Sequence, residues 1–231
     1  MARAPRLALA GELHYLLQRG HNGQSVFADD ADREAYMVML REAATQHRVA
    51  IHAYALLDAE IHLLATPAEA ESLSRLMQSM GRRYVSAFNR RHSRSGTLWA
   101  GRFRGGLIDG QALGLEAILH VELQPARAGC AADAGGWPWS SAAHHLGQRR
   151  DPLVTEHSAY WALGNTPFER EYAYAHKLLE GMPLGLADTI DRAVFQGRAV
   201  GPAEFAVHAE ERTGRSMQAR RRGRPARTGK K

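Results

Sequence analysis

The sequence predicts an α+β domain in which helices pack on a mainly antiparallel β-sheet. Strand-like and helix-like apolar patterns alternate over residues 13–123 in the order strand, helix, strand, strand, helix, strand, helix. The second and third strand segments are joined by the short turn Asp58-Ala59, which makes them an antiparallel hairpin. A chain of 231 residues with 45% hydrophobic residues is also long enough and apolar enough to bury a sizeable core.

Each predicted element carries a local signal. Strand segments are apolar runs bounded by turn residues, and helices have apolar residues at intervals of three and four. Asp29 or Asp30 can cap the first helix, because a carboxylate accepts hydrogen bonds from the free amides of the first turn. The last helix of the series stops before Pro125, since the residue preceding proline avoids helical dihedral angles. The predicted strands are 13–19, 49–57, 60–66 and the end of the segment 96–108, and the predicted helices are 31–47, 69–92 and 111–123.

Three regions are predicted along the chain. The α+β domain spans residues 1–155, a helical extension spans 156–211, and a basic tail spans 212–231. In the extension, Thr166-Pro167 is a favourable helix start, with threonine as the cap and proline in the first turn. A second helix is expected near 202–212, opened by the Gly-Pro pair that precedes it.

The net charge of +6 comes from the C-terminal end. From Arg212 onward there are nine Lys or Arg residues and no Asp or Glu, whereas residues 1–211 hold 21 basic and 24 acidic residues. We expect this tail to be disordered when free and to bind a polyanion. Arg221, Arg222 and Arg224 surround an Arg-Gly-Arg-Pro core that resembles an AT-hook, in which arginines enter an A·T-rich minor groove. A general polybasic tail is the alternative.

Composition disfavours membrane and secreted classes. No apolar run approaches the ~18 residues that cross a membrane. The N-terminal segment is basic, but its apolar part is short and is interrupted by Glu12, unlike a signal peptide. A single cysteine, Cys130, excludes an internal disulfide and fits a reducing cytosol. We therefore expect a cytoplasmic protein with no membrane partner.

Glu60 and His62 are the first candidate site residues. Alternate side chains of a strand point to the same face, so these two side chains are neighbours on the strand 60–66. A carboxylate and an imidazole together can hold a hard divalent cation against a phosphate. The alternative is structural: a carboxylate at the end of a turn and a half-buried, hydrogen-bonded histidine.

His120 and Gln124 form a second candidate pair. They are four residues apart at the end of the helix 111–123, and such residues share one face. We expect this helix to lie across the sheet face that carries Glu60 and His62.

Arginines cluster toward the end of the helix 69–92 and in the segment that follows it. On a helix next to a metal site they can follow a phosphate backbone, whereas a solvated charged face is the alternative. The candidate DNA-binding arginines in this part of the chain are Arg82, Arg83, Arg90, Arg91, Arg102 and Arg104.

A series of blocks resembles the single-tyrosine transposases of the IS200-like superfamily, in the long form of the REP-associated tyrosine transposases. The resemblance covers roughly residues 5–170, in order and with similar spacings. The blocks are Gly-His-Asn-Gly-Gln (20–24), Ile-His-Ala-Tyr-Ala-Leu-Leu (51–57), Ile-His-Leu-Leu-Ala-Thr-Pro (61–67), Leu-Met-Gln-Ser-Met-Gly-Arg-Arg-Tyr-Val (76–85), Gly-Thr-Leu-Trp-Ala-Gly-Arg-Phe (96–103), Pro-Ala-Arg-Ala-Gly (125–129), Trp-Pro-Trp-Ser-Ser (137–141) and Tyr-Trp-Ala-Leu-Gly (160–164).

The resemblance implies a ferredoxin-like, HUH-type fold and the cleavage and rejoining of single-stranded or hairpin DNA. In this family two histidines that flank a hydrophobic residue bind Mg²⁺ or Mn²⁺, which polarises the scissile phosphate. A tyrosine on a helix attacks the phosphate and forms a covalent intermediate, and an amide four residues later completes the metal shell. The resemblance also implies a bacterial protein associated with the nucleoid.

This sequence departs from the family pattern at the positions of the chemistry. Glu60 stands at the first metal-binding histidine, so the metal ligands implied here are Glu60, His62 and Gln124. His120 stands at the position of the nucleophilic tyrosine. A carboxylate remains an acceptable ligand for Mg²⁺, but attack by an imidazole would form a phosphoramidate, a different intermediate.

Three functions are compatible with these changes. The chain is an active single-strand endonuclease and transposase, a domesticated DNA-binding protein that no longer cleaves, or a scaffold for a protein partner. Short members of the family are dimers that exchange helices. The long C-terminal extension of this chain favours a monomer over a homodimer.

Overall fold

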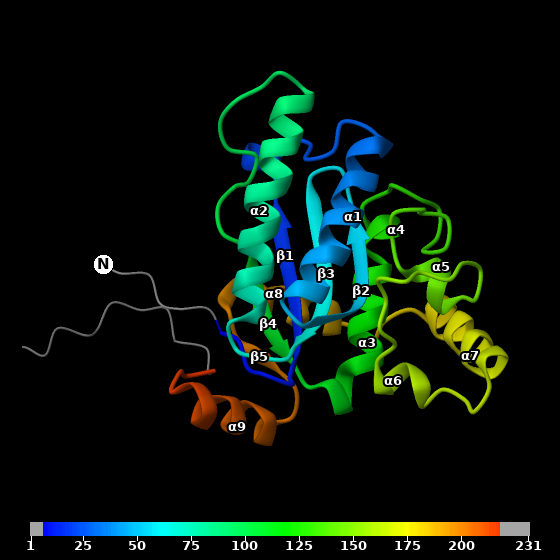
Figure 1. Ribbon diagram of the computed structural model, residues 1–231. Helices are drawn as coiled ribbons and strands as arrows, with labels where there is room; N and C mark the ends of the chain where they lie inside the picture. Colours follow the sequence, from blue (N-terminus) through cyan, green and yellow to red (C-terminus); the bar gives the residue numbers. More distant parts are fainter. Residues whose placement is uncertain (1–6, 218–231) are drawn as a thin grey trace, which may run out of the picture.

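A five-stranded sheet forms the centre of the molecule in the computed structural model, which describes residues 7–217 (Figure 1). The strand order is β2-β3-β1-β4-β5. β1 pairs antiparallel with β3 and β4, β2 pairs antiparallel with β3, and only the short β5 runs parallel to its neighbour β4. The strands are β1 (Leu13–Arg19), β2 (Val49–Leu56), β3 (Glu60–Pro67), β4 (Arg104–Ile108) and β5 (Ala199–Val200). The predicted α+β class with a mainly antiparallel sheet is confirmed.

The helices agree with the predicted ranges through residue 123. Asp29 caps α1, and Thr166 and Glu169 form a reciprocal capping box at the start of α7. None of the described helices has the length and apolar character needed to cross a bilayer. The helical elements are α1 (Asp30–Gln46), α2 (Ser72–Arg91), α3 (Gly110–Glu122), α4 (Gln124–Arg127), α5 (Ala142–His145), α6 (Ser158–Trp161), α7 (Pro167–Glu180), α8 (Leu186–Gln196) and α9 (Ala203–Thr213), with a short 3-10 turn η1 (His21–Gly23).

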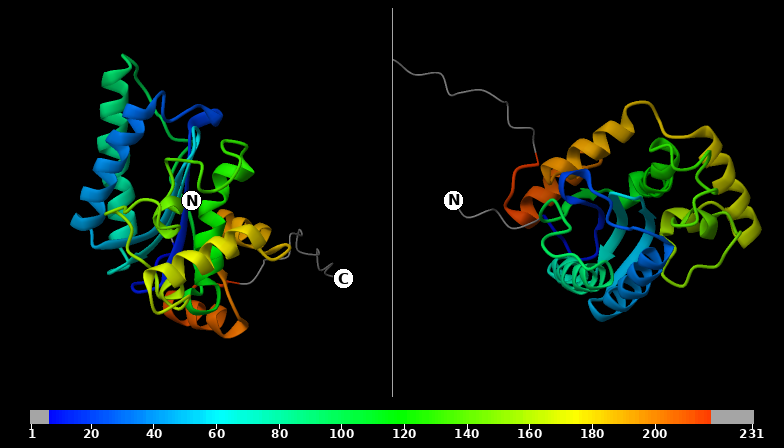
Figure 2. Two further views of the ribbon diagram at one scale, coloured as in Figure 1. Left: turned by 90° about the vertical axis from the view of Figure 1, so that its right-hand side faces the viewer. Right: turned by 90° about the horizontal axis from the view of Figure 1, so that it is seen from above.

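The sheet separates two hydrophobic layers, seen edge-on in the left view of Figure 2. On one face, α1 and α2 pack on side chains such as Leu16 and Leu63. On the other face, α3, α7 and α8 pack on side chains such as Leu17 and Leu64. Since neighbouring strand residues point to opposite faces, β1, β2 and β3 each contribute to both layers.

The segment predicted as a helical extension belongs to the same core. α8 supplies Ile190 and Val194 to the layer that contains α3, and β5 adds an edge strand to the sheet. Neither element was predicted, because a strand of two residues has no readable period and α8 begins without a side-chain cap. The predicted tail boundary at residue 212 falls inside α9, where Arg212 pairs with Glu12 at 2.6 Å.

A buried carboxylate fastens the C-terminal helices to the sheet layer. Glu122, at the end of α3, is fully buried and accepts hydrogen bonds from Tyr174 at 2.5 Å, from His145 at 2.7 Å and from Ser141. A buried charge is tolerated only when its oxygens are satisfied by donors. These donors come from α7 and from the segment formed by Ser141 and α5, so one side chain joins two segments to the end of α3.

Candidate functional site

Two neighbouring strands bring Glu60 and His62 to a common face with Arg19. In the β1–β3 pair, Arg19 lies directly opposite Glu60, and Leu17 lies opposite His62. Side chains that face each other across two strands are close enough to interact. Arg19 Nε lies 2.7 Å from Glu60 Oε1, and the Arg19 guanidinium also lies 4.5 Å from the centre of the Phe195 ring. The Glu60 carboxylate therefore already has a cation as its partner.

His62 is buried, and one of its two ring nitrogens is hydrogen-bonded to Tyr15. The Tyr15 hydroxyl lies 2.5 Å from His62 Nδ1, and a phenol that donates to Nδ1 leaves the ring proton on Nε2. His62 Nε2 is 3.4 Å from Glu60 Oε2, which is too long for a good hydrogen bond, so this buried nitrogen has no hydrogen-bond partner within the described chain. Burial lowers the pKa of His62 although Glu60 acts in the opposite direction, and the imidazole is neutral at pH 7.

Tyr15 links the strand residues to α3. Its ring meets the His120 ring edge-on, with 5.1 Å between the ring centres. Burial, together with the charges of Asp191 and Glu60, raises the pKa of Tyr15 well above its usual value. A phenol must lose its proton to attack phosphorus. In this environment Tyr15 is a hydrogen-bond donor to His62 rather than a nucleophile.

His120 lies at the centre of the cluster and is fully buried. Its Nε2 is 3.0 Å from Asp191 Oδ1, and its Nδ1 is 3.3 Å from a guanidinium nitrogen of Arg127. Since the guanidinium can only donate and the carboxylate can only accept, Nδ1 carries the lone pair and Nε2 carries the proton. Both ring nitrogens are therefore engaged by the protein, and neither offers a free lone pair to a phosphate.

Gln124 reaches His120 but turns its amide toward the helix. Gln124 Nε2 donates to the main-chain oxygen of His120 at 3.1 Å and lies 3.1 Å from His120 Nε2. The predicted neighbours Glu60, His62, His120 and Gln124 are thus brought into one cluster through Tyr15, as expected for a helix lying across this sheet face. Within that cluster, the Gln124 amide satisfies a main-chain oxygen at the end of α3.

The family resemblance implies Mg²⁺ or Mn²⁺ at this cluster. Glu60 Oε2 and His62 Nε2 face each other at 3.4 Å and are two possible ligands. Arg19 competes with a cation for Glu60, and Gln124 is bonded elsewhere. Among residues 7–217 no group of three or more His, Cys, Asp or Glu side chains is arranged to hold a metal ion. The side chains as they lie do not fit a divalent cation, which needs several oxygen-rich ligands.

Asp191 comes from α8, far along the sequence from the other site residues. Burial acts to raise the pKa of its carboxyl, but the hydrogen bond from His120 and the charge of Arg127 outweigh it and hold that pKa below its usual value. The ionised carboxylate thus closes the network over His120. α8 acts as a cover on the face where the resemblance expects substrate.

Sequence reasoning missed four residues of this cluster: Tyr15, Arg19, Arg127 and Asp191. The period of β1 could have found the first two, since Tyr15 and Arg19 share a strand face with Leu17. No local signal identifies Arg127 or Asp191, because their role depends on how α4 and α8 dock.

The arginines of α2 lie on the other face of the sheet. The expectation that they stand next to the metal candidates is wrong, because α2 packs in the layer of Leu16 and Leu63. Arg83 pairs with Glu42, and Arg91 pairs with Asp29 at 2.6 Å and with Asp32 at 2.5 Å. Arg82 and Arg90 are exposed and form no ion pair with another described residue.

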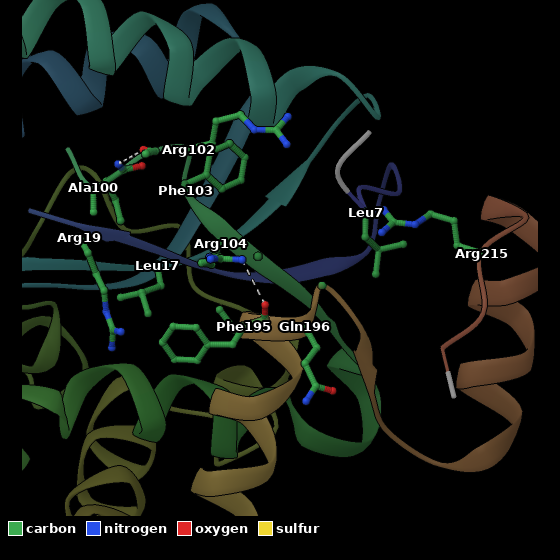
Figure 3. Close-up of a pocket in the computed structure, with 15 residues that line it drawn as sticks. Leu7, Leu17, Arg19, Ala100, Arg102, Phe103, Arg104, Phe195, Gln196 and Arg215 are labelled. Carbon is green, nitrogen blue, oxygen red and sulfur yellow. Dashed lines mark hydrogen bonds between the residues drawn. The ribbon is translucent and has the colours of Figure 1, made fainter. Parts of the chain in front are cut away.

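Arg102 and Arg104 lie elsewhere, at the start of β4. They line a cavity of about 340 Å³ together with Arg19, at the end of the β1–β4 pair (Figure 3). The remaining predicted DNA-binding residues, Arg221, Arg222 and Arg224, fall outside the residues that the structure describes.

Comparison with known proteins gives a match of fold rather than of sequence. No protein-family model and no curated protein sequence matches the chain. Among solved structures, a REP-associated tyrosine transposase bound to a REP hairpin superposes with a TM-score of 0.51 and 15% identity, over 67% of this chain and 91% of that one. A protein assigned as a transposase from Deinococcus radiodurans R1 gives a TM-score of 0.35 and 22% identity, over 45% of this chain and 84% of that one. The chain therefore has the fold of a REP-associated tyrosine transposase.

Proposed function

We propose that the protein binds single-stranded or hairpin DNA and does not cleave it. DNA binding is supported by the fold, which is shared with a transposase solved on a REP hairpin, and by exposed arginines without ion-pair partners. We also propose that one copy of the chain binds DNA, in the bacterial cytoplasm at the nucleoid.

The proposed loss of cleavage rests on the burial and hydrogen bonding of His120. This residue stands where the family has its nucleophile, yet it is fully buried and both ring nitrogens are bonded, one to Asp191 and one to Arg127. A nucleophile must present a free electron pair to phosphorus within a near-attack geometry. The pairing of Glu60 with Arg19 acts in the same direction, since the carboxylate is neutralised by a protein cation.

The test uses a labelled single-stranded hairpin DNA and the full chain, with Mg²⁺, with Mn²⁺ and with a chelator. We expect a retarded complex of equal amount in all three conditions, with no shortened DNA and no covalent adduct on a denaturing gel. Independently of activity, we expect Mn²⁺ to leave the melting temperature unchanged, because a ligand that binds the folded state would raise it.

Variants identify the group responsible if cleavage occurs. An adduct formed by the wild type and lost in His120→Ala would overturn the non-cleaving proposal, and loss in Tyr15→Phe instead would assign the chemistry to Tyr15. The double variant Glu60→His/His120→Tyr restores the residues of the family pattern, and cleavage gained there would support loss of chemistry in this chain. Absence of any DNA complex at low salt would refute the DNA-binding proposal itself.

A further inference from the structure

A cavity of about 340 Å³ opens at the end of the β1–β4 pair, where β4 begins and α8 ends (Figure 3). Four arginines line it, and no Asp or Glu is among the lining residues. They come from β1 (Arg19), from the start of β4 (Arg102 and Arg104) and from the segment after α9 (Arg215). Although Arg19 is paired with Glu60, the positive charges of Arg102 and Arg104 beside it favour the entry of an anion.

Two of these arginines lack the carboxylate partner that several other arginines of the molecule have. Arg33, Arg83 and Arg91 each have a carboxylate partner. Arg102 and Arg104 are exposed and have no ion-pair partner within residues 7–217. Within the described chain, the Arg104 guanidinium donates to the Phe195 main-chain oxygen at 3.5 Å, the limit of such a contact. Their donors remain available to a ligand.

The backbone around the cavity is held in place. Gly101 has φ = 143°, a conformation that side chains rarely adopt. Its carbonyl accepts a hydrogen bond from the buried Gln18 side chain at 3.0 Å. On the other wall, Gly197 ends α8 in the left-handed conformation. The segment that carries Arg102 and Arg104 is thus fixed at its base, and less entropy is lost when a ligand binds.

We propose that this cavity binds one phosphate of a single DNA strand, an inference that rests on the proposed function. The planar guanidinium fork matches the oxygens of a phosphate and donates two parallel hydrogen bonds to it. The cavity is at the lower end of ligand sites, roughly 300–1,000 Å³, so it accepts one nucleotide unit and excludes the width of a duplex. Because Arg19 lines the cavity and also pairs with Glu60, the bound strand passes beside the Glu60–His62 cluster.

The test measures fluorescence anisotropy of a labelled single-stranded oligothymidylate with the full chain, over a series of salt concentrations. The variant Arg102→Ala/Arg104→Ala removes the two unpaired arginines. The matched control, Arg41→Ala/Arg150→Ala, also removes two exposed arginines without ion-pair partners in the described chain. Thermal unfolding of all three proteins checks that each is folded.

We expect the Arg102/Arg104 variant to bind roughly ten-fold or more weakly, the loss of a charge-assisted contact. The slope of log K against log salt should fall by about 0.7, the value for one phosphate of a single strand. The control should change by about two-fold at most. Equal weakening in both double variants would assign the effect to general surface charge and would refute the proposed phosphate site in the cavity.

Thymidine monophosphate separates this inference from the proposed function. If the inference is correct, the mononucleotide competes with the oligonucleotide on the wild type, and calorimetry detects its binding to the wild type but not to the Arg102/Arg104 variant. Unchanged oligonucleotide affinity in that variant would refute the phosphate site in the cavity. The proposal that the protein binds DNA would be unaffected. A wild type that binds the mononucleotide through these arginines but no oligonucleotide would refute the DNA partner and retain the phosphate site.

Discussion

Glu60 stands where the family resemblance implies a metal-binding histidine, and Arg19 faces it across the strand pair. His62 and Arg19, in that order, hold the pKa of Glu60 below its usual value, so the carboxylate is ionised at neutral pH. A guanidinium beside a carboxylate satisfies its charge without the several further ligands that a divalent cation needs. At the scale of single residues, the site holds an ion pair and a chain of hydrogen bonds where the resemblance implies metal ligands.

His14 provides a residue-scale prediction about pH. It is buried, and its burial lowers its pKa to about 4, with the Glu12 main-chain oxygen acting in the opposite direction. In the unfolded chain an ordinary histidine titrates near 6.5. Between these values the unfolded state binds more protons, so the free energy of unfolding falls as pH drops from about 6.5 toward 4. The loss from His14 is on the order of 3 kcal/mol.

The measurement is urea unfolding at several pH values between 4 and 7. His14→Gln should flatten the decline of stability relative to the wild type, since glutamine does not titrate. His21→Gln, which replaces an exposed histidine, is the control and should leave the curve unchanged. Parallel curves for the wild type and His14→Gln would contradict the prediction.

At the scale of elements, the docking of α8 determines which groups His120 and Arg19 contact. It packs on β4 and carries both Asp191, bonded to His120, and Phe195, beneath Arg19. Gly106 of β4 allows this close packing, because a Cβ there would lie 3.0 Å from the Arg198 carbonyl and 3.2 Å from the Val194 backbone. The helix therefore covers the face of β1 and β3 that carries the candidate residues.

Asp191→Ala tests this docking. The substitution leaves the proton of His120 Nε2 buried without its acceptor, and an unsatisfied buried donor costs about 1–3 kcal/mol. The free energy of unfolding, measured with urea, should fall by that amount. Asp188→Ala is the control, because Asp188 is exposed on the same helix and should change stability by less than about 1 kcal/mol. Equal effects of the two substitutions would show that the contact does not stabilise the fold.

At the scale of the whole molecule, one chain supplies every residue of the described cluster. β1 and β3 contribute Tyr15, Arg19, Glu60 and His62, and the helices contribute His120 (α3), Gln124 and Arg127 (α4) and Asp191 (α8). The helix that covers the site comes from the same chain, so no helix from a second copy is needed to complete it.

We therefore predict a monomer, both free and bound to a hairpin DNA. Light scattering after size-exclusion chromatography should give the mass of one chain, and the complex should add one DNA molecule. Dilution over a hundred-fold range should leave the mass of the free protein unchanged. A mass of two chains that falls on dilution would contradict this prediction.

The sequence by itself determined the class of fold and most element boundaries up to residue 123, because strand and helix periods, caps and the hairpin turn are local signals. It also predicted Glu60, His62, His120 and Gln124 as candidate site residues, and the structure places them in one cluster. Only the tertiary structure decided what surrounds them. The pairing of Arg19 with Glu60 depends on strand register, and the bond of Asp191 to His120 depends on the docking of α8. Register and docking are contacts between distant segments, and no local pattern in the chain records them.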